Sequence, residues 1–225
     1  MKIIITGATG FLGRNLAESF HADGLQVTAT GRSSAVGDEL HKESILFKKA
    51  DILNLNQLNN AFSPADCVIH CAARSGPWGK YRDFYDTNVV GTRNVIKLCK
   101  KHHIKKIIFI STPSIYFTGK DRYNISNGDP ISVKEWFFQV LTIFNRPFKP
   151  KNVPESAAKI IAGIMEFGSY LPFAKKEPSM ARFTIEYMSK SMTMTIDKAK
   201  QKLNYSPQVS NQQGFERYAT WYYSK

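Results

Sequence analysis

The chain has 225 residues, 43% of them hydrophobic and 22% charged, and a formal net charge of +13. This length and apolar content suffice for one large α/β domain, alone or with a small appendage. No run of about 18 uncharged apolar residues occurs, so we expect no membrane-spanning helix.

Part of the positive charge is clustered near the end of a predicted helix, at Lys97, Lys100, Lys101, Lys105 and Lys106. We favour a solvated surface, in which cations near a helix C-terminus are stabilised by the helix dipole. The alternative is attraction to a polyanion such as nucleic acid or an acidic membrane surface. No aromatic residues interleave with these lysines, so no nucleic-acid partner is expected.

The three cysteines, Cys67, Cys71 and Cys99, lie in apolar runs. Their odd number and their surroundings predict buried thiols in a reducing, cytoplasmic protein. Cys67 and Cys71 have no further ligand types nearby, so no metal site is expected. No signal peptide is expected either, because glycine-rich turn chemistry begins at Gly7, before an apolar core could develop.

The first thirteen residues predict a strand, a glycine turn and the start of a helix. Residues 2–6 form a β-branched run typical of a strand buried on both faces. The glycines then follow at Gly7, Gly10 and Gly13. Gly7 can make the tight turn, Gly10 lets the backbone approach a pyrophosphate, and Gly13 lets the helix pack against the strand. Together with free N–H groups at the helix N-terminus, this order predicts a dinucleotide site.

Further elements follow in alternation along the chain. The apolar positions Leu12, Leu16 and Phe20 predict one buried face of the first helix. Short apolar runs predict strands at 25–30, 45–47, 66–73 and 106–110, with a turn after the second strand. The apolar spacing predicts helices over 54–62 and 81–99, the latter with a buried face formed by Tyr81, Tyr85, Asn88, Thr92, Val95 and Cys99. His70 lies inside an apolar strand and is expected to be a packed core residue.

The G-x-x-G-x-x-G spacing after Thr6 resembles the extended branch of the short-chain dehydrogenase/reductase superfamily, which includes NAD-dependent epimerases, dehydratases and 3β-hydroxysteroid-dehydrogenase-like enzymes. The resemblance implies a Rossmann-type doubly wound parallel sheet of order 3-2-1-4-5 with a small, mostly helical C-terminal substrate lobe. It implies hydride transfer at a secondary alcohol or ketone of a sterol-like or nucleotide-sugar-like substrate. It also allows a homodimer.

The resemblance carries cofactor roles onto individual positions. Where an acidic residue would bind the ribose of NAD, this chain has Gly31 and Arg32, which favours NADP over NAD, although Arg32 could be a solvated turn residue. Asp51 and Ile52 match the neighbours of the adenine. The residues expected to contact or support the cofactor are Gly7, Thr9, Gly10, Phe11, Leu12, Gly13, Arg32, Asp51, Ile52, Cys71, Ala72, Ala73, Asn88 and Ser111.

The family pattern breaks at its proton donor. Family members use a Tyr whose pKa is lowered by a Lys four residues later on a helix. The chain has this spacing at Tyr116 and Lys120, but Gly119 intervenes and no helical periodicity surrounds it. We therefore expect this pair to be no catalytic pair, and Thr112, the match to the family's substrate-binding hydroxyl, to be the catalytic-type residue that remains.

The resemblance implies that an internal block is absent near residues 123–127, because the chain there resembles segments that the family places much later. This divides the chain into a dinucleotide-binding domain, 1–122, and a remnant of the substrate lobe, 127–225. In the second part, Ile160, Ile161, Ile164 and Phe167 mark a helix over 155–167. We expect a packed core helix there, with docking on a membrane as the alternative.

The sequence therefore predicts an NADP-preferring oxidoreductase or epimerase whose activity in this 225-residue form is doubtful. One alternative is a non-catalytic NADP-binding sensor or interaction module with a basic surface. A further alternative is a remnant impaired in folding, because loss of a sixth strand would expose a sheet edge and apolar helix faces.

Overall fold

The computed structural model describes residues 1–112, 123–147, 150–171, 177–190 and 193–224. The chain divides into two compact units, Met1–Thr112 and Pro113–Lys225. The domain boundary that the sequence predicts at 122–127 stays a prediction, since residues 113–122 lie outside the described part of the chain.

The first unit is built on a five-stranded parallel sheet, and its order is β3-β2-β1-β4-β5, as predicted. The central strand, β1, pairs with β2 on one side and with β4 on the other, so that Thr6 is level with both Thr30 and His70. The carboxyl ends of the strands, where ligands bind in open parallel sheets, therefore meet at the glycine turn. The strands are β1 (Lys2–Thr6), β2 (Gln26–Gly31), β3 (Leu46–Lys49), β4 (Cys67–His70) and β5 (Lys106–Phe109).

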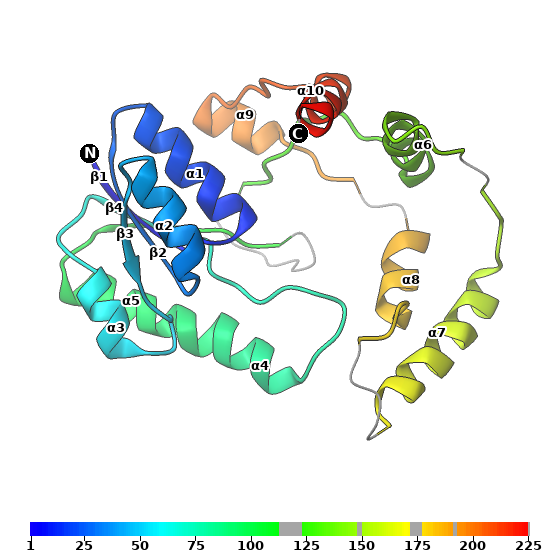
Figure 1. Ribbon diagram of the computed structural model, residues 1–225, viewed down its shortest axis with the longest axis horizontal. Coiled ribbons are helices and arrows are strands. Elements are labelled where there is room, and N and C mark those ends of the chain that lie inside the picture. Colours follow the sequence, from blue (N-terminus) through cyan, green and yellow to red (C-terminus); the bar gives the residue numbers. More distant parts are fainter. Residues whose placement is uncertain (113–122, 148–149, 172–176, 191–192, 225) are drawn as a thin grey trace. The chain divides into compact units, whose positions relative to one another are not determined.

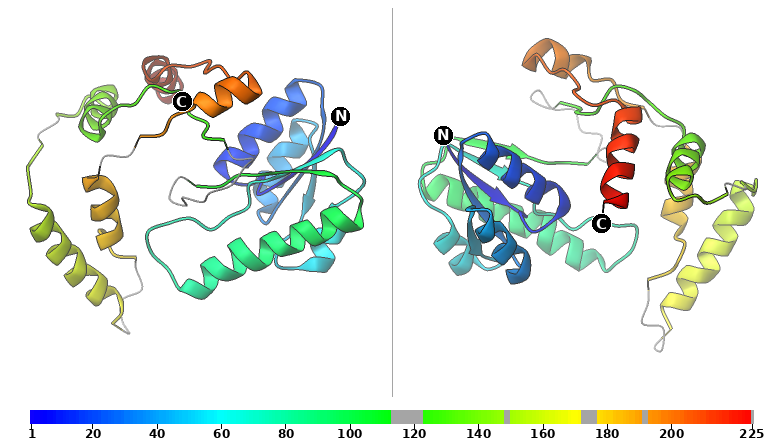
Figure 2. Two further views of the ribbon diagram at one scale, coloured as in Figure 1. Left: turned by 180° about the vertical axis from the view of Figure 1, so that it is seen from behind. Right: turned by 45° about the horizontal axis from the view of Figure 1, so that its top comes forward.

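Helices cover both faces of this sheet (Figures 1 and 2). On one face lie α1 (Phe11–Ala22) and α2 (Ser34–Lys42), and on the other lie α3 (Leu55–Ala61) and α5 (Thr92–Lys101). Because side chains alternate along a strand, Ile3 and Ile5 enter the core cluster under α1 and α2, whereas Ile4 enters the cluster under α3 and α5. This explains why β1 is apolar at successive positions.

Helix α2 was not predicted, because the segment after β2 has the composition of a turn. The side chain of Ser33 accepts a hydrogen bond from the backbone N–H of Val36 at 3.4 Å and caps the helix. A Cβ at Gly37 would lie 2.3 Å from the ring of Phe47, so the glycine lets α2 lie directly on β3. A glycine contact of this kind leaves no apolar periodicity in the sequence.

The buried face of α1 also differs from the prediction. Leu12 is 43% exposed, whereas Gly13 and Ala17 are buried, and Leu16 and Phe20 are partly buried against the core. The small residues bring the helix axis close to the sheet, which leaves Leu12 at the open N-terminal end.

The long helix predicted over 81–99 is composed of three consecutive segments: α4 (Tyr81–Tyr85), a π-helix (Asp86–Gly91) and α5. Its buried face begins at Gly91 and continues through Val95, Leu98 and Cys99. The prediction that Tyr81 and Tyr85 belong to this face is wrong, since they are 79% and 37% exposed. Only the part of the helix from Gly91 onward packs on the core beneath the sheet.

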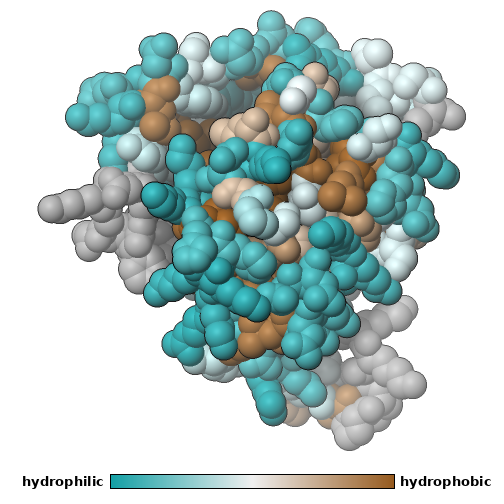
Figure 3. Space-filling model, turned by 90° about the vertical axis from the view of Figure 1, so that its left-hand side faces the viewer, coloured by the Kyte–Doolittle hydropathy of each residue, from teal (hydrophilic) through white to brown (hydrophobic). Residues whose placement is uncertain are grey.

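Strand β5 forms one edge of the sheet and is exposed along its whole length. Ile107, Ile108 and Phe109 are 40%, 46% and 51% exposed, although strands of parallel sheets are ordinarily buried on both faces. Elsewhere on the surface, hydrophobic side chains (brown) also reach solvent between hydrophilic ones (teal), as Figure 3 shows. The absence of a sixth strand stays a prediction, since residues 113–122 lie outside the described part of the chain.

The second unit is helical in its described residues. Phe144 packs edge-on against Tyr222, with 4.7 Å between the ring centroids, and this contact joins the first and last of its helices. None of the helices in the described part of the chain has the length and apolarity of a membrane span. The helices are α6 (Val133–Ile143), α7 (Glu155–Ser169), α8 (Arg182–Ser189), α9 (Asp197–Leu203) and α10 (Asn211–Tyr223).

The prediction that α7 is a packed core helix is wrong. Its buried positions are Ala162 and Glu166, whereas Ile160 and Phe167 are 65% and 71% exposed. Glu166 accepts hydrogen bonds from the backbone N and from Nε of Arg182, each at 2.7 Å, and these bonds hold α7 against α8. This ion pair directs the side of α7 that carries Ala162 and Glu166 toward α8 and leaves the side with Ile160 exposed.

Candidate dinucleotide-binding site

The turn after β1 requires glycine at its first and last glycine positions. Gly7 has φ +73°, and a Cβ there would lie 2.6 Å from the backbone N of Ala72. A Cβ at Gly13 would lie 2.3 Å from the carbonyl oxygen of Gly7. The first glycine thus lets the turn contact the end of β4, and the last lets α1 pack on the turn, as the sequence predicts.

The middle glycine is different, because the protein itself does not require it. Gly10 has φ −96°, and a Cβ there would meet only the carbonyl oxygen of Gly7, at 3.4 Å. Gly10 is the N-cap of α1, which has no side-chain cap and no acidic residue in its first turn. The adjacent Phe11 is 89% exposed. An uncapped helix N-terminus behind an open glycine fits the pyrophosphate of a dinucleotide.

The end of β2 adjoins the same turn. The backbone N of Ala8 donates to the carbonyl oxygen of Thr30 at 3.0 Å, and a Cβ at Gly31 would lie 2.6 Å from Oγ1 of Thr9. Arg32 follows directly and is exposed. The structure therefore brings Thr9 and the Gly31–Arg32 pair together at the place where the sequence predicts the adenosine ribose.

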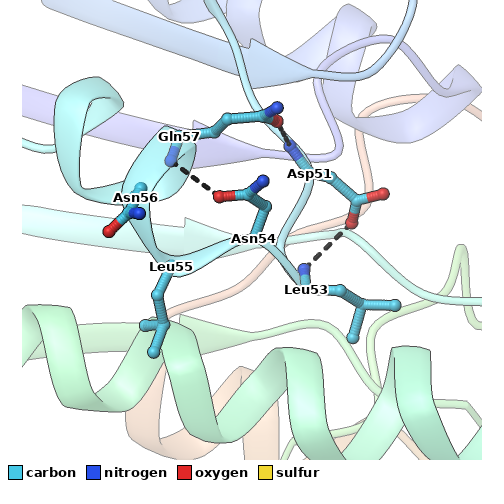
Figure 4. A pocket seen from close by; sticks show the side chains of 6 residues that line it. All are labelled: Asp51, Leu53, Asn54, Leu55, Asn56 and Gln57. Atoms are coloured by element: carbon cyan, nitrogen blue, oxygen red, sulfur yellow. Dashed lines mark hydrogen bonds between the residues drawn. The ribbon is translucent and has the colours of Figure 1, made fainter.

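An open pocket of about 520 Å³ lies between β3 and α3, lined by Asp51 and residues 53–57 (Figure 4). Its wall is held by side-chain hydrogen bonds. Leu53 N donates to Oδ1 of Asp51 at 2.9 Å, and Asp51 N donates to Oε1 of Gln57 at 3.1 Å. Ile52, the other predicted adenine neighbour, is buried in the core, so Asp51 alone of that pair lines this pocket.

Small side chains follow β4 on the other side of the glycine turn. Cys71 and Ala72 are half-buried and Ala73 is exposed. Burial raises the pKa of the Cys71 thiol to about 11, so this thiol is neutral at neutral pH. The backbone N of Cys71 donates to the carbonyl oxygen of Thr6 at 3.1 Å, which fixes this segment next to the turn.

Asn88, in the π-helix, holds the loop that leaves β4. Arg74 N donates to Oδ1 of Asn88 at 2.8 Å, and Nδ2 of Asn88 donates to the carbonyl oxygen of Arg74 at 2.9 Å. The amide side chain of Asn88 thus pairs with both the N–H and the carbonyl group of Arg74. Asn88 supports the architecture of the site rather than reaching into it.

His70 is fully buried, as predicted. Its Nδ1 lies 2.6 Å from Oγ1 of Thr6, and its Nε2 lies 3.0 Å from Oγ1 of Thr92. Burial lowers the pKa of the imidazole to about 4, so the ring is neutral at neutral pH.

Ser111 and Thr112 follow β5 and are both exposed. The backbone N of Ile110 donates to the carbonyl oxygen of His70 at 3.1 Å, so this segment leaves the sheet beside β4. The predicted role of Thr112 stays a prediction. Tyr116 and Lys120, the pair with the catalytic spacing that we expect not to be catalytic, lie outside the described residues.

Several supporting residues were missed by the sequence analysis. Thr6, Thr92 and Arg74 hold the site through hydrogen bonds that join three separate segments. For Thr92 the sequence offered one signal, its spacing of four residues from Asn88 on a predicted helix. The partners of these two side chains, His70 and the backbone of Arg74, lie in other segments of the chain. Asn54, which caps α3 by accepting from Gln57 N at 3.1 Å, had the ordinary signature of an N-cap before a helix.

Comparison with known proteins agrees with this geometry. The model of the NAD dependent epimerase/dehydratase family matches residues 3–132. The chain is 35% identical over 126 residues to the 2-alkyl-3-oxoalkanoate reductase of Shewanella oneidensis, covering 56% of this chain and 32% of that protein. It is 26% identical over 187 residues to the human decarboxylating sterol-4-alpha-carboxylate 3-dehydrogenase, covering 82% of this chain and 48% of that protein.

The chain therefore spans about a third to a half of the length of these curated relatives. Among solved structures, the crystal structure of gox2253 matches with a TM-score of 0.67, over 91% of this chain and 93% of that one. The sequence identity in that match is 16%, so it shows a shared fold.

Proposed function

This chain belongs to the NAD-dependent epimerase/dehydratase family, and we propose that it binds NADP and transfers hydride at a secondary alcohol or ketone. The observation that carries the proposal is that the packing of the protein requires two of the three glycines but not the third. Gly7 and Gly13 are required by the packing of the protein, whereas the fold leaves room at Gly10, where we propose that the cofactor approaches the helix N-terminus. The nicotinamide, when bound, supplies the hydride acceptor or donor.

The described residues would divide the binding of this cofactor among them. The first turn of α1 would hold the pyrophosphate, Asp51 would lie beside the adenine, and the small residues Ala72 and Ala73 would leave room for the cofactor next to β4. Thr112 would donate a hydrogen bond from its hydroxyl to the substrate oxygen. Cys71 would remain a neutral thiol and take no part in proton transfer.

The substrate class that we propose is based on the reactions for which two relatives are named. A 2-alkyl-3-oxoalkanoate and a sterol-4-alpha-carboxylate oxidised at position 3 both have the reacting carbon next to the carbon that bears the carboxylate. We propose a substituted 3-oxo or 3-hydroxy acid, with nucleotide-sugar-like substrates as the alternative class. Turnover is measured as oxidation of NADPH when a 3-oxo acid is added, and as reduction of NADP⁺ when a 3-hydroxy acid is added.

The decisive experiment on the cofactor is the replacement of Gly10 by valine. A branched side chain there would occupy the space in front of the helix N-terminus, and we expect the affinity for NADPH to fall more than about tenfold. Because a Cβ there would meet only the carbonyl oxygen of Gly7, at 3.4 Å, the loss of stability should be limited to the preference for glycine over valine at the N-cap, about 1 kcal/mol. Unchanged NADPH binding, measured by fluorescence titration, would contradict the proposal.

Arg32 tests the choice between NADP and NAD. The proposed contact joins its guanidinium to the 2′-phosphate, and charged hydrogen bonds of this kind contribute about 1.5–3 kcal/mol. We expect Arg32→Ser to weaken NADPH binding by about 10- to 100-fold and to leave NADH binding unchanged. An equal effect on both cofactors, or on neither, would show that Arg32 is a solvated turn residue.

A second candidate is a non-catalytic NADP-binding module. It is favoured by the pattern after β5, where Thr112 is the catalytic-type residue that the sequence retains, and by the basic net charge of +13. NADPH binding without turnover of any 3-oxo acid, together with salt-sensitive retention on a polyanion column, would support this candidate. With either function, we propose a cytoplasmic protein, in agreement with its three free thiols, which are buried or half-buried.

A further inference from the structure

We propose that His70 is a positioning residue that fixes the π-helix through Thr92 and thereby fixes, through Asn88, the loop bordering the dinucleotide site. The inference concerns hydrogen bonds within the first unit, and it deepens the proposed function because it rests on that site being the cofactor site. The imidazole does not touch the ligand. It acts through two intermediate side chains.

The direction of each hydrogen bond follows from counting protons. The hydroxyl of Thr92 donates its only proton to the carbonyl oxygen of Asn88 at 2.7 Å. It must therefore accept from His70, which places the ring proton on Nε2. Nδ1 is then the unprotonated nitrogen, and the hydroxyl of Thr6 donates to it at 2.6 Å. Three bonds thus run in one direction from β1 to the π-helix.

This arrangement uses the full hydrogen-bonding capacity of a neutral imidazole. His70 and Thr6 are each 0% exposed, so no solvent competes for either ring nitrogen. The lowered pKa of the ring agrees with the same protonation state. Two hydrogen bonds that satisfy both nitrogens of a buried ring favour one geometry strongly, because displacement of the ring would leave a buried polar atom unpaired.

The π-helix is the element that this network controls. A threonine hydroxyl that bonds to the carbonyl four residues earlier competes with the backbone and distorts a helix. Thr92 makes such a bond to Asn88, immediately after the π-helical turn. On its other side, a Cβ at Gly91 would lie 2.4 Å from Cδ1 of Ile52, so the helix is also held against the core. The wide turn is fixed from two directions.

The consequence reaches the cofactor site through Asn88. Its amide holds the backbone of Arg74, two residues beyond Ala72, and Ala72 contacts Gly7 of the cofactor turn. Thr6, at the start of the network, directly precedes Gly7. The same network therefore fixes the glycine turn at one end and the loop after β4 at the other. It sets the distance between two sides of the site.

The test uses a matched pair of substitutions at Thr92, which is half-buried. Thr92→Val keeps the shape of the side chain and removes the hydroxyl, whereas Thr92→Ser keeps the hydroxyl. With Val, we expect amide hydrogen exchange of residues 73–80 to rise by about 2- to 10-fold and NADPH affinity to fall by a similar factor, as for one lost hydrogen bond. Ser should restore both to within about twofold.

The wild-type protein provides a readout that is independent of any variant. Its ¹⁵N NMR signals should show His70 protonated on Nε2 and unprotonated on Nδ1, and Thr92→Val should shift the Nε2 signal. A ring protonated on Nδ1 would overturn the inference, as would unchanged exchange of residues 73–80 in Thr92→Val. Absence of NADPH binding in the wild type would instead refute the proposed function, and the NMR and exchange results would still decide the role of His70.

Discussion

Replacing Gly7 with alanine is expected to destabilise the first unit by about 2–5 kcal/mol. Alanine at the observed φ of +73° costs about 1–2 kcal/mol. Its Cβ would in addition lie 2.6 Å from the backbone N of Ala72, and forcing an atom into packed structure costs about 1–3 kcal/mol. Because domains are stable by only about 5–15 kcal/mol, this change removes a large share of the total.

Gly24 provides the matched control. It also has a positive φ, +80°, but no atom lies within 4 Å of the position of its Cβ. Gly24→Ala should therefore cost only the backbone term, about 1–2 kcal/mol. Urea unfolding of both variants measures the two terms separately, and equal losses would show that the close approach of the turn to β4 contributes nothing.

The stability of the first unit is expected to fall as the pH drops from about 6.5 to about 4, because of His70. Burial lowers the pKa of this imidazole from 6.5 to about 4 in the folded protein. The unfolded chain therefore takes up a proton at a higher pH than the folded one. Titration of His70 leaves the free energy of unfolding unchanged above pH 6.5. This free energy falls by about 3 kcal/mol in total as the pH drops from 6.5 to about 4.

Two measurements isolate this effect from the carboxylates that titrate at low pH. An NMR titration of the folded protein should show the His70 ring unprotonated down to about pH 4. The free energy of unfolding of His70→Gln should depend less on pH between 6.5 and 4 than that of the wild type. A ring that titrates near pH 6.5 in the folded state would contradict the structure.

The sheet could be predicted from sequence because its signals are local. The run Ile3–Ile5 and the apolar residues at β4 identify strands by composition, and right-handed connections then leave few topologies. The buried face of α1 could not be predicted, because Gly13 and Ala17 form it, and α2 could not, because Leu40 is its one large buried side chain beside Gly37. The orientation of α7 depends on the pairing of Glu166 with Arg182 in another helix, which periodicity does not contain.

The candidate site divides in the same way. The glycine spacing identifies the turn, and the structure adds the reason, since Gly7 faces Ala72 and Gly13 faces Gly7. Asn88 could be assigned by resemblance, but its partner, the backbone of Arg74, could not. The role of His70 was invisible for a physical reason: a histidine in an apolar strand has the same sequence pattern whether its two nitrogens hold a network or simply fill space.

The position of β1 at the centre of the sheet also has a consequence for synthesis on the ribosome. Ile3 pairs with Cys67, and the separation of paired residues on these two strands is 64. At about 5–20 residues per second, roughly 3–13 s pass between the appearance of β1 and that of its second partner. Throughout that interval the β4-facing edge of this run of isoleucines is unpaired, so the speed of translation sets how long the nascent chain exposes it.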